Sequence, residues 1–179
     1  GFVTAFLQTK LSVPSILAGI ITNIGLYSIN LMVMGKSNQS LFMADTIYTM
    51  ANEAGFAGSW YKLAVTAGIV IVVAVLLVLF LGTRLGLSIR ATGDNADMVR
   101  ASSINPTFTI TVGLCVANAL TGLSGAMVAQ YSTFADVNSG TGMGVLALAA
   151  LVIGETLIGK SSMARGVVGV IAGSIIYRC

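Results

Sequence analysis

The chain has 179 residues, of which 56% are hydrophobic and 8% are charged, and its mean hydropathy is +0.94. Soluble domains carry about 25% charged residues, so this composition excludes an ordinary soluble domain and indicates an integral membrane protein. The formal net charge is +3. Because the basic residues lie between apolar segments rather than on one soluble face, they indicate membrane topology and argue against a nucleic-acid partner.

The apolar segments predict an all-α fold, a polytopic transmembrane helical bundle. About five full or partial spans are expected, at 12–34, 63–83, 107–132, 144–159 and 167 to the end. The second of these spans shows the scale: the 21 residues of 63–83, rising about 1.5 Å each, reach about 31 Å, the thickness of a bilayer core. A truncated N-terminal span is expected before Lys10. Both ends look cut, so we expect residues 1–179 to be a fragment that forms one transmembrane domain.

The fourth span is short and follows a glycine-rich stretch, NSGTGMG at 138–144. Irregular backbone is costly in lipid unless it is buried in protein or faces a water-filled cavity. The sequence therefore predicts a short broken or re-entrant helix at this point. Glu155 lies near the inner end of the span, where an ion pair at the membrane interface is favoured over a proton relay.

The distribution of Lys and Arg predicts the orientation, because these residues collect on the inner side of membranes. Inner loops are expected at 83–106 and 155–166, and outer loops at 35–62 and 133–144. Six basic residues then lie inside (Lys10, Arg84, Arg90, Arg100, Lys160 and Arg165) and three outside (Lys36, Lys62 and Arg178). The first outer loop has apolar residues near helical spacing, which favours an interfacial helix; a soluble outer cap is the alternative.

The inner loop 83–106 concentrates charge in a chain that otherwise avoids it. Asp94 is predicted to cap a short amphipathic helix, with Asp97 near its positive N-terminal end and Arg100 towards its negative C-terminal end. Asn105 should cap the next span, with Pro106 at the first helical position, where a missing N–H costs nothing. The alternative is a loop that is charged only because it is in water.

One short segment fits the phosphate-binding loop of nucleotide hydrolases, GETLIGKS at 154–161. That loop works between a strand and a helix of an α/β sheet, where backbone N–H groups converge on phosphate. The surrounding sequence predicts bilayer-length helices and no such sheet. We therefore interpret the segment as a span that ends in a polar, basic inner turn, and a nucleotide site is the remote alternative.

Polar and small residues inside the spans suggest contacts between helices. Asn23, Asn30, Asn118 and Gln130 are expected either to bond neighbouring helices or to line a solute path. Small residues recur every four positions at Ala117, Thr121, Gly125 and Ala129, and Gly169 and Gly173 form a GxxxG pair. Such faces let helix backbones approach closely. Packing inside one subunit is favoured over a dimer seam for both series.

Residue types that usually perform catalysis are scarce. The chain contains no histidine, which removes the usual general base and the commonest metal ligand. Its two cysteines, Cys115 and Cys179, have neither a disulfide nor a metal-ligand spacing. We expect no catalytic residue, no metal and no cofactor.

Three quoted stretches carry a family resemblance: KLSVPSILAGIITNIGLYSINLMVMGKSN, LGLSIRATGDNADMVRASSINP and GLCVANALTGLSGAMVAQYSTFADVNSGTGMGVLALAALVIGETLIG. They resemble the membrane permease subunits of bacterial ABC importers, in the superfamily of branched-chain amino acid and ribose permeases, and a branch linked to amino-acid uptake. The resemblance covers nearly all 179 residues. It implies a multi-pass permease of the bacterial inner membrane that imports a small organic solute, such as an amino acid. Specificity would rest largely with a binding protein.

The resemblance also implies partners and site residues. The partners are ABC ATPase subunits inside, an extracytoplasmic solute-binding protein outside, a second permease in a homodimer or heterodimer, and membrane lipid. The inner loops would couple to the ATPases through Arg90, Asp94, Asp97, Arg100, Glu155, Lys160 and Arg165, with the segment 155–166 as the principal contact. The solute path would include Asn118, Gln130, Gly142 and Gly144. An ion-coupled secondary transporter or channel is the alternative function.

Overall fold

The computed structural model describes residues 1–41, 46–53, 60–140, 142–158 and 163–178, and these are almost wholly helical. The elements in chain order are α1 (Phe2–Lys10), α2 (Ser15–Met34), β1 (Asn38–Ser40), α3 (Ile47–Glu53), α4 (Tyr61–Gly82), α5 (Arg84–Asp94), α6 (Ala96–Ala101), α7 (Pro106–Ser132), β2 (Phe134–Asp136), the 3-10 helix η1 (Val137–Gly140), α8 (Met143–Ile158) and α9 (Met163–Arg178). The predicted all-α bundle is confirmed.

Four stretches are long and apolar enough to cross a membrane: α2, α4, α7 and the run Val137–Leu157 that contains α8. The apolar part of α9, Arg165–Tyr177, is shorter. The predicted break in the fourth span is confirmed, because η1 ends at Gly140 and α8 begins at Met143, with Gly142 between them at a φ of 84°. Only glycine adopts that backbone conformation without strain.

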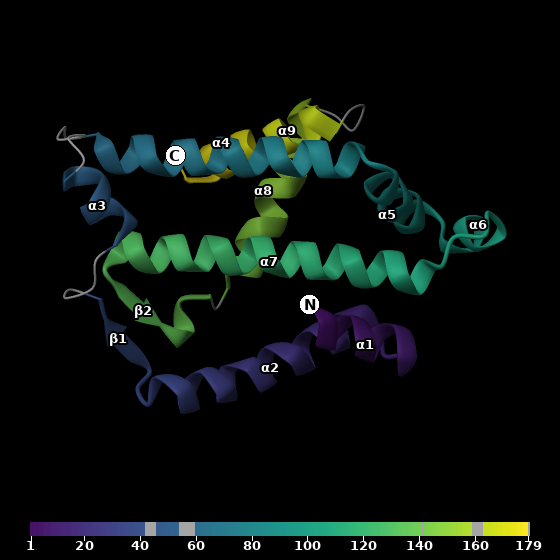
Figure 1. The fold of residues 1–179 in the computed structure, drawn as a ribbon, viewed down its shortest axis with the longest axis horizontal. Helices are drawn as coiled ribbons and strands as arrows, with labels where there is room; N and C mark the ends of the chain where they lie inside the picture. The colour runs from purple at the N-terminus through teal and green to yellow at the C-terminus, as the bar shows by residue number, and fades with distance from the viewer. Residues whose placement is uncertain (42–45, 54–59, 141, 159–162, 179) are drawn as a thin grey trace.

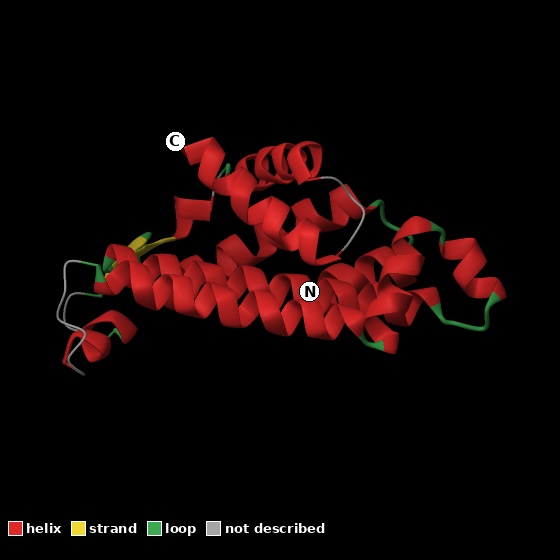
Figure 2. Cartoon of the chain, turned by 90° about the horizontal axis from the view of Figure 1, so that it is seen from above, coloured by secondary structure: helices red, strands yellow, loops and turns green. Residues whose placement is uncertain are grey.

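The long helices lie along one another, and their connections gather at two opposite ends of the bundle (Figure 1). One end carries α5 and α6, and the other carries α3 and the strands β1 and β2. Seen at 90° to this view, α8 and α9 pack as a pair beside the longer helices (Figure 2). The predicted inner loop 83–106 is therefore at the opposite end from both predicted outer loops. Which end faces the cell interior stays a prediction.

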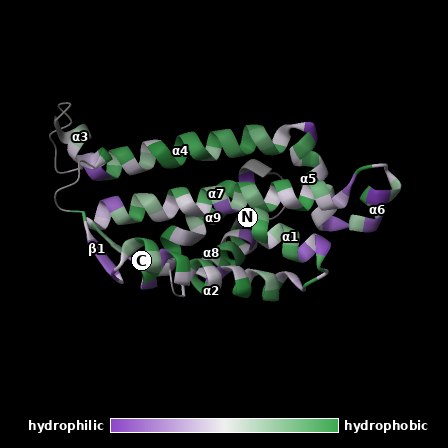
Figure 3. Ribbon diagram, turned by 60° about the horizontal axis from the view of Figure 1, so that its bottom comes forward, coloured by the Kyte–Doolittle hydropathy of each residue, from purple (hydrophilic) through white to green (hydrophobic). Residues whose placement is uncertain are grey.

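Most large apolar side chains lie on the exposed outer faces of the helices rather than in a buried core. None of the α4 span is buried, and Ile71, Val72 and Leu76 are all exposed. Figure 3 shows α4 hydrophobic along nearly its whole length, with hydrophilic residues on α5, α6 and β1. The buried positions are mostly small or hydroxyl-bearing, among them Ala5, Ala18, Thr92 and Thr109. This is the pattern expected where lipid, not water, surrounds the helices.

Glycines bring α8 and α9 into backbone contact. A Cβ placed on Gly154 would overlap the carbonyl group of Gly169, and one on Gly173 would overlap the carbonyl oxygen of Ala150. The prediction that the Gly169/Gly173 pair packs inside one subunit is confirmed. Gly154, the first residue of the nucleotide-loop match, lies inside α8 with no strand before it.

The corresponding series on α7 is left largely uncovered by the described part of the chain, so its packing inside one subunit stays a prediction. Ala117, Thr121 and Gly125 are exposed, and no described atom lies within 4 Å of a Cβ built on Gly125. The reason is geometric, because α7 uses its other faces to contact α1, α5 and α3. The small-residue face is left open in this chain.

A two-stranded ribbon at the end opposite α5 was not predicted. β1 and β2 are antiparallel, with Asn38 opposite Asp136 and Ser40 opposite Phe134. Each strand follows a residue in the left-handed conformation, Gly35 after α2 and Thr133 after α7. The ribbon therefore joins the C-terminal ends of α2 and α7.

Candidate functional site

The charged loop predicted to be internal is a folded unit of two helices, α5 and α6, which we call the inner module (residues 84–101). α5 is amphipathic. Gly86, Ile89 and Thr92 form a stripe directed at the bundle, whereas the opposite stripe is exposed and consists of Arg84, Leu87, Arg90 and Asp94. Both stripes have the three- and four-residue spacing of one helix face. The alternative of an unstructured solvated loop is therefore wrong.

A tight turn fixes α5 to the end of α4. The Thr83 side-chain oxygen accepts a hydrogen bond from the Gly86 N–H at 3.3 Å and so caps α5. A Cβ on Gly86 would overlap the backbone of Leu81 and Phe80. Glycine is thus required where the chain leaves the span and turns back on it.

Two contacts fix α5 to α7. A Cβ on Gly113 would lie 3.2 Å from Ile89 Cγ2, so the Ile89 side chain packs against the α7 backbone at this glycine. One turn away, the hydroxyl oxygens of Thr92 and Thr109 lie 2.8 Å apart. The pairs 89 with 113 and 92 with 109 run in opposite directions along the sequence. The two helices are therefore antiparallel where they touch.

The cap of α6 differs from the prediction. Asp94 is the last residue of α5, and Asn95 caps α6, its side-chain oxygen accepting from the N–H groups of Asp97 and Met98 at 3.0 and 3.1 Å. Asp and Asn cap equally well, but the Asn95 N–H still donates to the Ala91 carbonyl at 2.9 Å, so α5 continues through Asp94 and the break falls one residue later. Val99 anchors α6 with 2% of its surface exposed.

The cap of α7 agrees with the prediction. Asn105 accepts from the Thr107 N–H at 3.0 Å, and Pro106 is the first helical residue.

The predicted coupling residues of the inner module gather on its outer surface. Arg90, Asp94, Asp97 and Arg100 are all exposed. Asp97 and Arg100 are 3.7 Å apart, 92% and 72% exposed, and such a pair contributes ~0–1 kcal/mol. Their charges are therefore available to a partner.

Sequence reasoning missed two apolar residues on the same surface: Leu87 is 58% exposed and Met98 66% exposed. The spacing of Leu87 between Arg84 and Arg90 on one face was the signal that could have found it.

The second predicted inner segment is described only in part. Glu155 is half-buried on α8 and Arg165 is exposed at the start of α9, while Lys160 lies outside the described residues. The nucleotide-loop alternative lacks its structural basis, because the residues before Gly154 are helical rather than a strand. Residues 159–161 of that match also lie outside the described ranges.

The predicted solute-path residues do not form one site. Asn118, in the middle of α7, is exposed, and its Nδ2 donates to the Leu114 carbonyl at 2.8 Å. Gln130 is twelve residues further along the helix, about 18 Å away. Its Oε1 accepts from the Ile47 N–H at 3.1 Å. Gly142 and Gly144 are exposed, with no described atom within 4 Å of an added Cβ.

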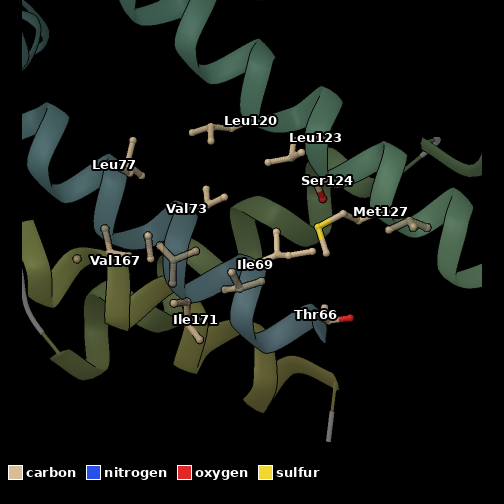
Figure 4. A pocket seen from close by; sticks show the side chains of 15 residues that line it. Thr66, Ile69, Val73, Leu77, Leu120, Leu123, Ser124, Met127, Val167 and Ile171 are labelled. Carbon is tan, nitrogen blue, oxygen red and sulfur yellow. The ribbon is translucent and has the colours of Figure 1, made fainter. Parts of the chain in front are cut away.

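An apolar groove of about 480 Å³ lies between α4, α7 and α9. Figure 4 shows Ile69, Val73 and Leu77 of α4 facing Leu123 and Met127 of α7 across it, with Val167 and Ile171 of α9 below. Two polar side chains, Thr66 and Ser124, belong to its lining. The sequence did not predict this groove, because it depends on how three distant helices pack.

An aromatic cluster holds α3 at one end of the groove. The Tyr48 hydroxyl is 2.9 Å from the Thr66 hydroxyl, and the rings of Tyr48 and Tyr131 meet edge to face at 6.0 Å. Lys62 Nζ lies 5.6 Å from the centre of the Tyr131 ring, a cation–π contact. The predicted helix in the outer loop is confirmed over Ile47–Glu53. Its interfacial position stays a prediction.

In the ranges described, no group of three or more His, Cys, Asp or Glu residues could hold a metal ion.

Comparison with known proteins gives one family. The family described as branched-chain amino acid transport system / permease component matches residues 1–179. A tyrosine transport system permease protein of Clostridioides difficile (strain R20291) is 37% identical over 178 residues, 99% of this chain and 58% of that protein. An uncharacterized protein of Rickettsia prowazekii (strain Madrid E) is 30% identical over 157 residues, 88% of this chain and 54% of that protein. The chain thus spans somewhat more than half the length of these relatives. No solved structure matches it.

Proposed function

This chain belongs to the permease components of branched-chain amino acid transport systems, and from that premise we propose that it is the membrane subunit of an ATP-driven importer of the bacterial inner membrane. It forms the path for a small organic solute, and ATP is hydrolysed on separate ABC ATPase subunits. An extracytoplasmic solute-binding protein delivers the solute, and two permeases, identical or different, make the complete channel.

One observation carries this proposal, the inner module. The helices α5 and α6 carry exposed charges and lie at one end of the apolar spans, where α5 packs closely against α4 and α7. A surface exposed to water needs no such attachment, whereas a subunit that receives force from a partner does. Arg90, Asp94, Asp97 and Arg100 offer charges of both signs, and Leu87 and Met98 offer apolar anchors among them.

The solute path is proposed to run along the open face of α7. Asn118 and the small residues Thr121 and Gly125 are exposed there, and a polar side chain inside a span that packs against no described helix is a candidate for lining a solute path. Gly142, in the break before α8, and Gly144, in the first turn of α8, contribute to the same path. An uncharged wall of this kind suits an amino acid, and the relative named for tyrosine transport makes tyrosine the first solute to try.

The test is reconstitution of the full-length permease with its ATPase subunits and binding protein in liposomes. We expect labelled amino acid to accumulate only when ATP and the binding protein are present. An ATPase subunit unable to hydrolyse ATP is the control. Uptake driven by a proton or sodium gradient without the ATPase would replace this proposal with an ion-coupled secondary transporter, for which Glu155 would be the first candidate site.

A further inference from the structure

Thr92 and Thr109 form a buried hydroxyl pair between α5 and α7. Thr92 is 8% and Thr109 2% exposed, and their Oγ1 atoms are 2.8 Å apart. Thr109 is thus almost fully enclosed. Of the contacts that fasten α5, the turn at Gly86 and the packing of Ile89 are steric. Between α5 and α7, the threonine pair is the directional contact; the bond from the Gly86 N–H to Thr83 caps α5 at the end of α4.

The two hydroxyl protons of the pair can serve three possible hydrogen bonds, one across the pair and one to a carbonyl of each helix. Thr92 Oγ1 lies 2.7 Å from the Ser88 carbonyl oxygen and Thr109 Oγ1 lies 2.9 Å from the Pro106 carbonyl oxygen. Each hydroxyl has one proton, so either threonine can donate across the pair while the other donates to its own helix. The link between α5 and α7 therefore persists in both arrangements. It is lost only in the third arrangement, in which each hydroxyl donates to the carbonyl of its own helix.

The pair is placed between two functional surfaces. On α5, Arg90 and Asp94 occupy the exposed stripe opposite Thr92. On α7, Asn118 is nine residues beyond Thr109, about 14 Å along the same rigid helix. A displacement imposed on the charged stripe would reach α7 through this link.

We propose that the Thr92–Thr109 pair is a positioning joint that makes α5 and α7 move as one body, so that motion of the inner module is delivered to the solute-path part of α7. This inference rests on the proposed function. It assigns both threonines to coupling and neither to contact with solute or nucleotide.

The test compares isosteric variants in the reconstituted complex. Thr92→Val and Thr109→Val remove the hydroxyls, and we expect solute imported per ATP hydrolysed to fall about 3- to 20-fold, the range that loss of a hydrogen bond between membrane helices allows. Basal ATP hydrolysis and the yield of complex should be retained. Thr92→Ser and Thr109→Ser keep the hydroxyl and should restore the ratio, and the double valine variant should be no worse than either single one.

Thr111→Val is the matched control, because Thr111 donates to the Thr107 carbonyl at 2.7 Å within α7 and bridges no helices by that bond. It should leave the ratio unchanged. Valine variants at 92 and 109 that match the wild type, or serine variants that fail as the valines do, would overturn the joint.

A cross-link tests the same idea without weakening the fold. In a chain with Cys115 and Cys179 replaced by alanine, Thr92→Cys with Thr109→Cys places two sulfurs where the oxygens are in contact. If α5 and α7 move as one, oxidation to the disulfide should leave import intact. Loss of import on oxidation, recovered by reduction, would mean that the helices must slide past one another and would refute the joint.

Failure of the joint is distinguishable from failure of the proposed function. A wild-type complex that imports nothing with ATP would refute the function, whereas a wild type that imports and valine variants that equal it would refute the joint alone.

Discussion

The Gln130 side-chain oxygen accepts a hydrogen bond from the backbone N–H of Ile47, 3.1 Å away and 83 residues earlier in the chain. The bond joins the last turns of α7 to the first residue of α3. Together with the Tyr48–Tyr131 ring contact, it holds α3 across the ends of α4 and α7. Gln130 was expected either to bond a neighbouring helix or to line the solute path, and its geometry favours the first.

Replacement of Gln130 tests this interpretation. Gln130→Met removes the acceptor and should loosen α3, raising amide hydrogen exchange in residues 46–53 several-fold. Gln130→Glu replaces the amide oxygen with a carboxylate oxygen, which can also accept the bond, and should leave exchange near that of the wild type. Exchange that is equal in all three proteins would show that the bond does not hold α3.

Because α8 and α9 are in backbone contact, we expect replacement of a contact glycine by alanine to destabilise the protein, although alanine usually stabilises a helix. Gly154→Ala puts a methyl group against the Gly169 carbonyl, and such overpacking costs ~1–3 kcal/mol. Gly144→Ala is the control on the same helix, because no described atom lies within 4 Å of its added Cβ, and alanine favours helix by ~1 kcal/mol. Thermal unfolding in detergent should show a lower midpoint for Gly154→Ala and an equal or higher one for Gly144→Ala.

How far the sequence predicts this fold depends on which interaction decides each element. The span 63–83 agrees with α4 (Tyr61–Gly82), because an uncharged stretch of bilayer length has no alternative to helix. The cap of α7 was predictable because Asn105 and Pro106 act locally. The contacts around the candidate site could not be predicted in this way. The ribbon β1–β2, the Gln130 bond and the Thr92–Thr109 pair each join separate elements of the chain.

The cap of α6 shows the limit most clearly. Asp94 and Asn95 are adjacent, and either could cap a helix. In the structure the Asn95 N–H still donates to the Ala91 carbonyl at 2.9 Å, so α5 continues through Asp94 and Asn95 takes the cap. No local pattern contains that information.

Accessibility of single cysteines tests the orientation. Ser40 and Ser139 lie on exposed backbone at the end of the bundle with α3, and Ser102 is exposed beside the inner module. In a chain with Cys115 and Cys179 replaced, a membrane-impermeant maleimide added to intact cells should label Ser40→Cys and Ser139→Cys and spare Ser102→Cys. Since all three positions are exposed, lysed cells should label every variant. The reverse pattern in intact cells would invert the topology.

The break before α8 makes a prediction about the solute path. Gly144→Trp meets no described atom of this chain, so the protein level and ATPase binding should be nearly unchanged while import falls by about ten-fold or more, because the ring occupies the path. Gly142→Trp adds backbone strain at a φ of 84° and should also lower stability. Wild-type import by the Gly144→Trp complex would remove this segment from the path.

The two inner segments make separable predictions about ATPase coupling. Lys160 was expected to belong to the principal contact and lies outside the described residues, whereas Leu87 stands exposed among Arg84, Arg90 and Asp94. Lys160→Arg keeps the charge and should retain most transport, while Lys160→Glu should detach or uncouple the ATPase through mismatched charge.

Leu87→Ala removes an apolar anchor that no described helix covers. It should weaken co-purification of the ATPase by about 10-fold if the inner module is the main contact, and hardly at all if 155–166 is. Leu79→Ala is the matched control, an exposed leucine on α4 within the span, where no ATPase can reach. ATPase binding that is lost in Lys160→Glu and kept in Leu87→Ala would establish 155–166 as the principal contact; the opposite pair of results would move that role to α5.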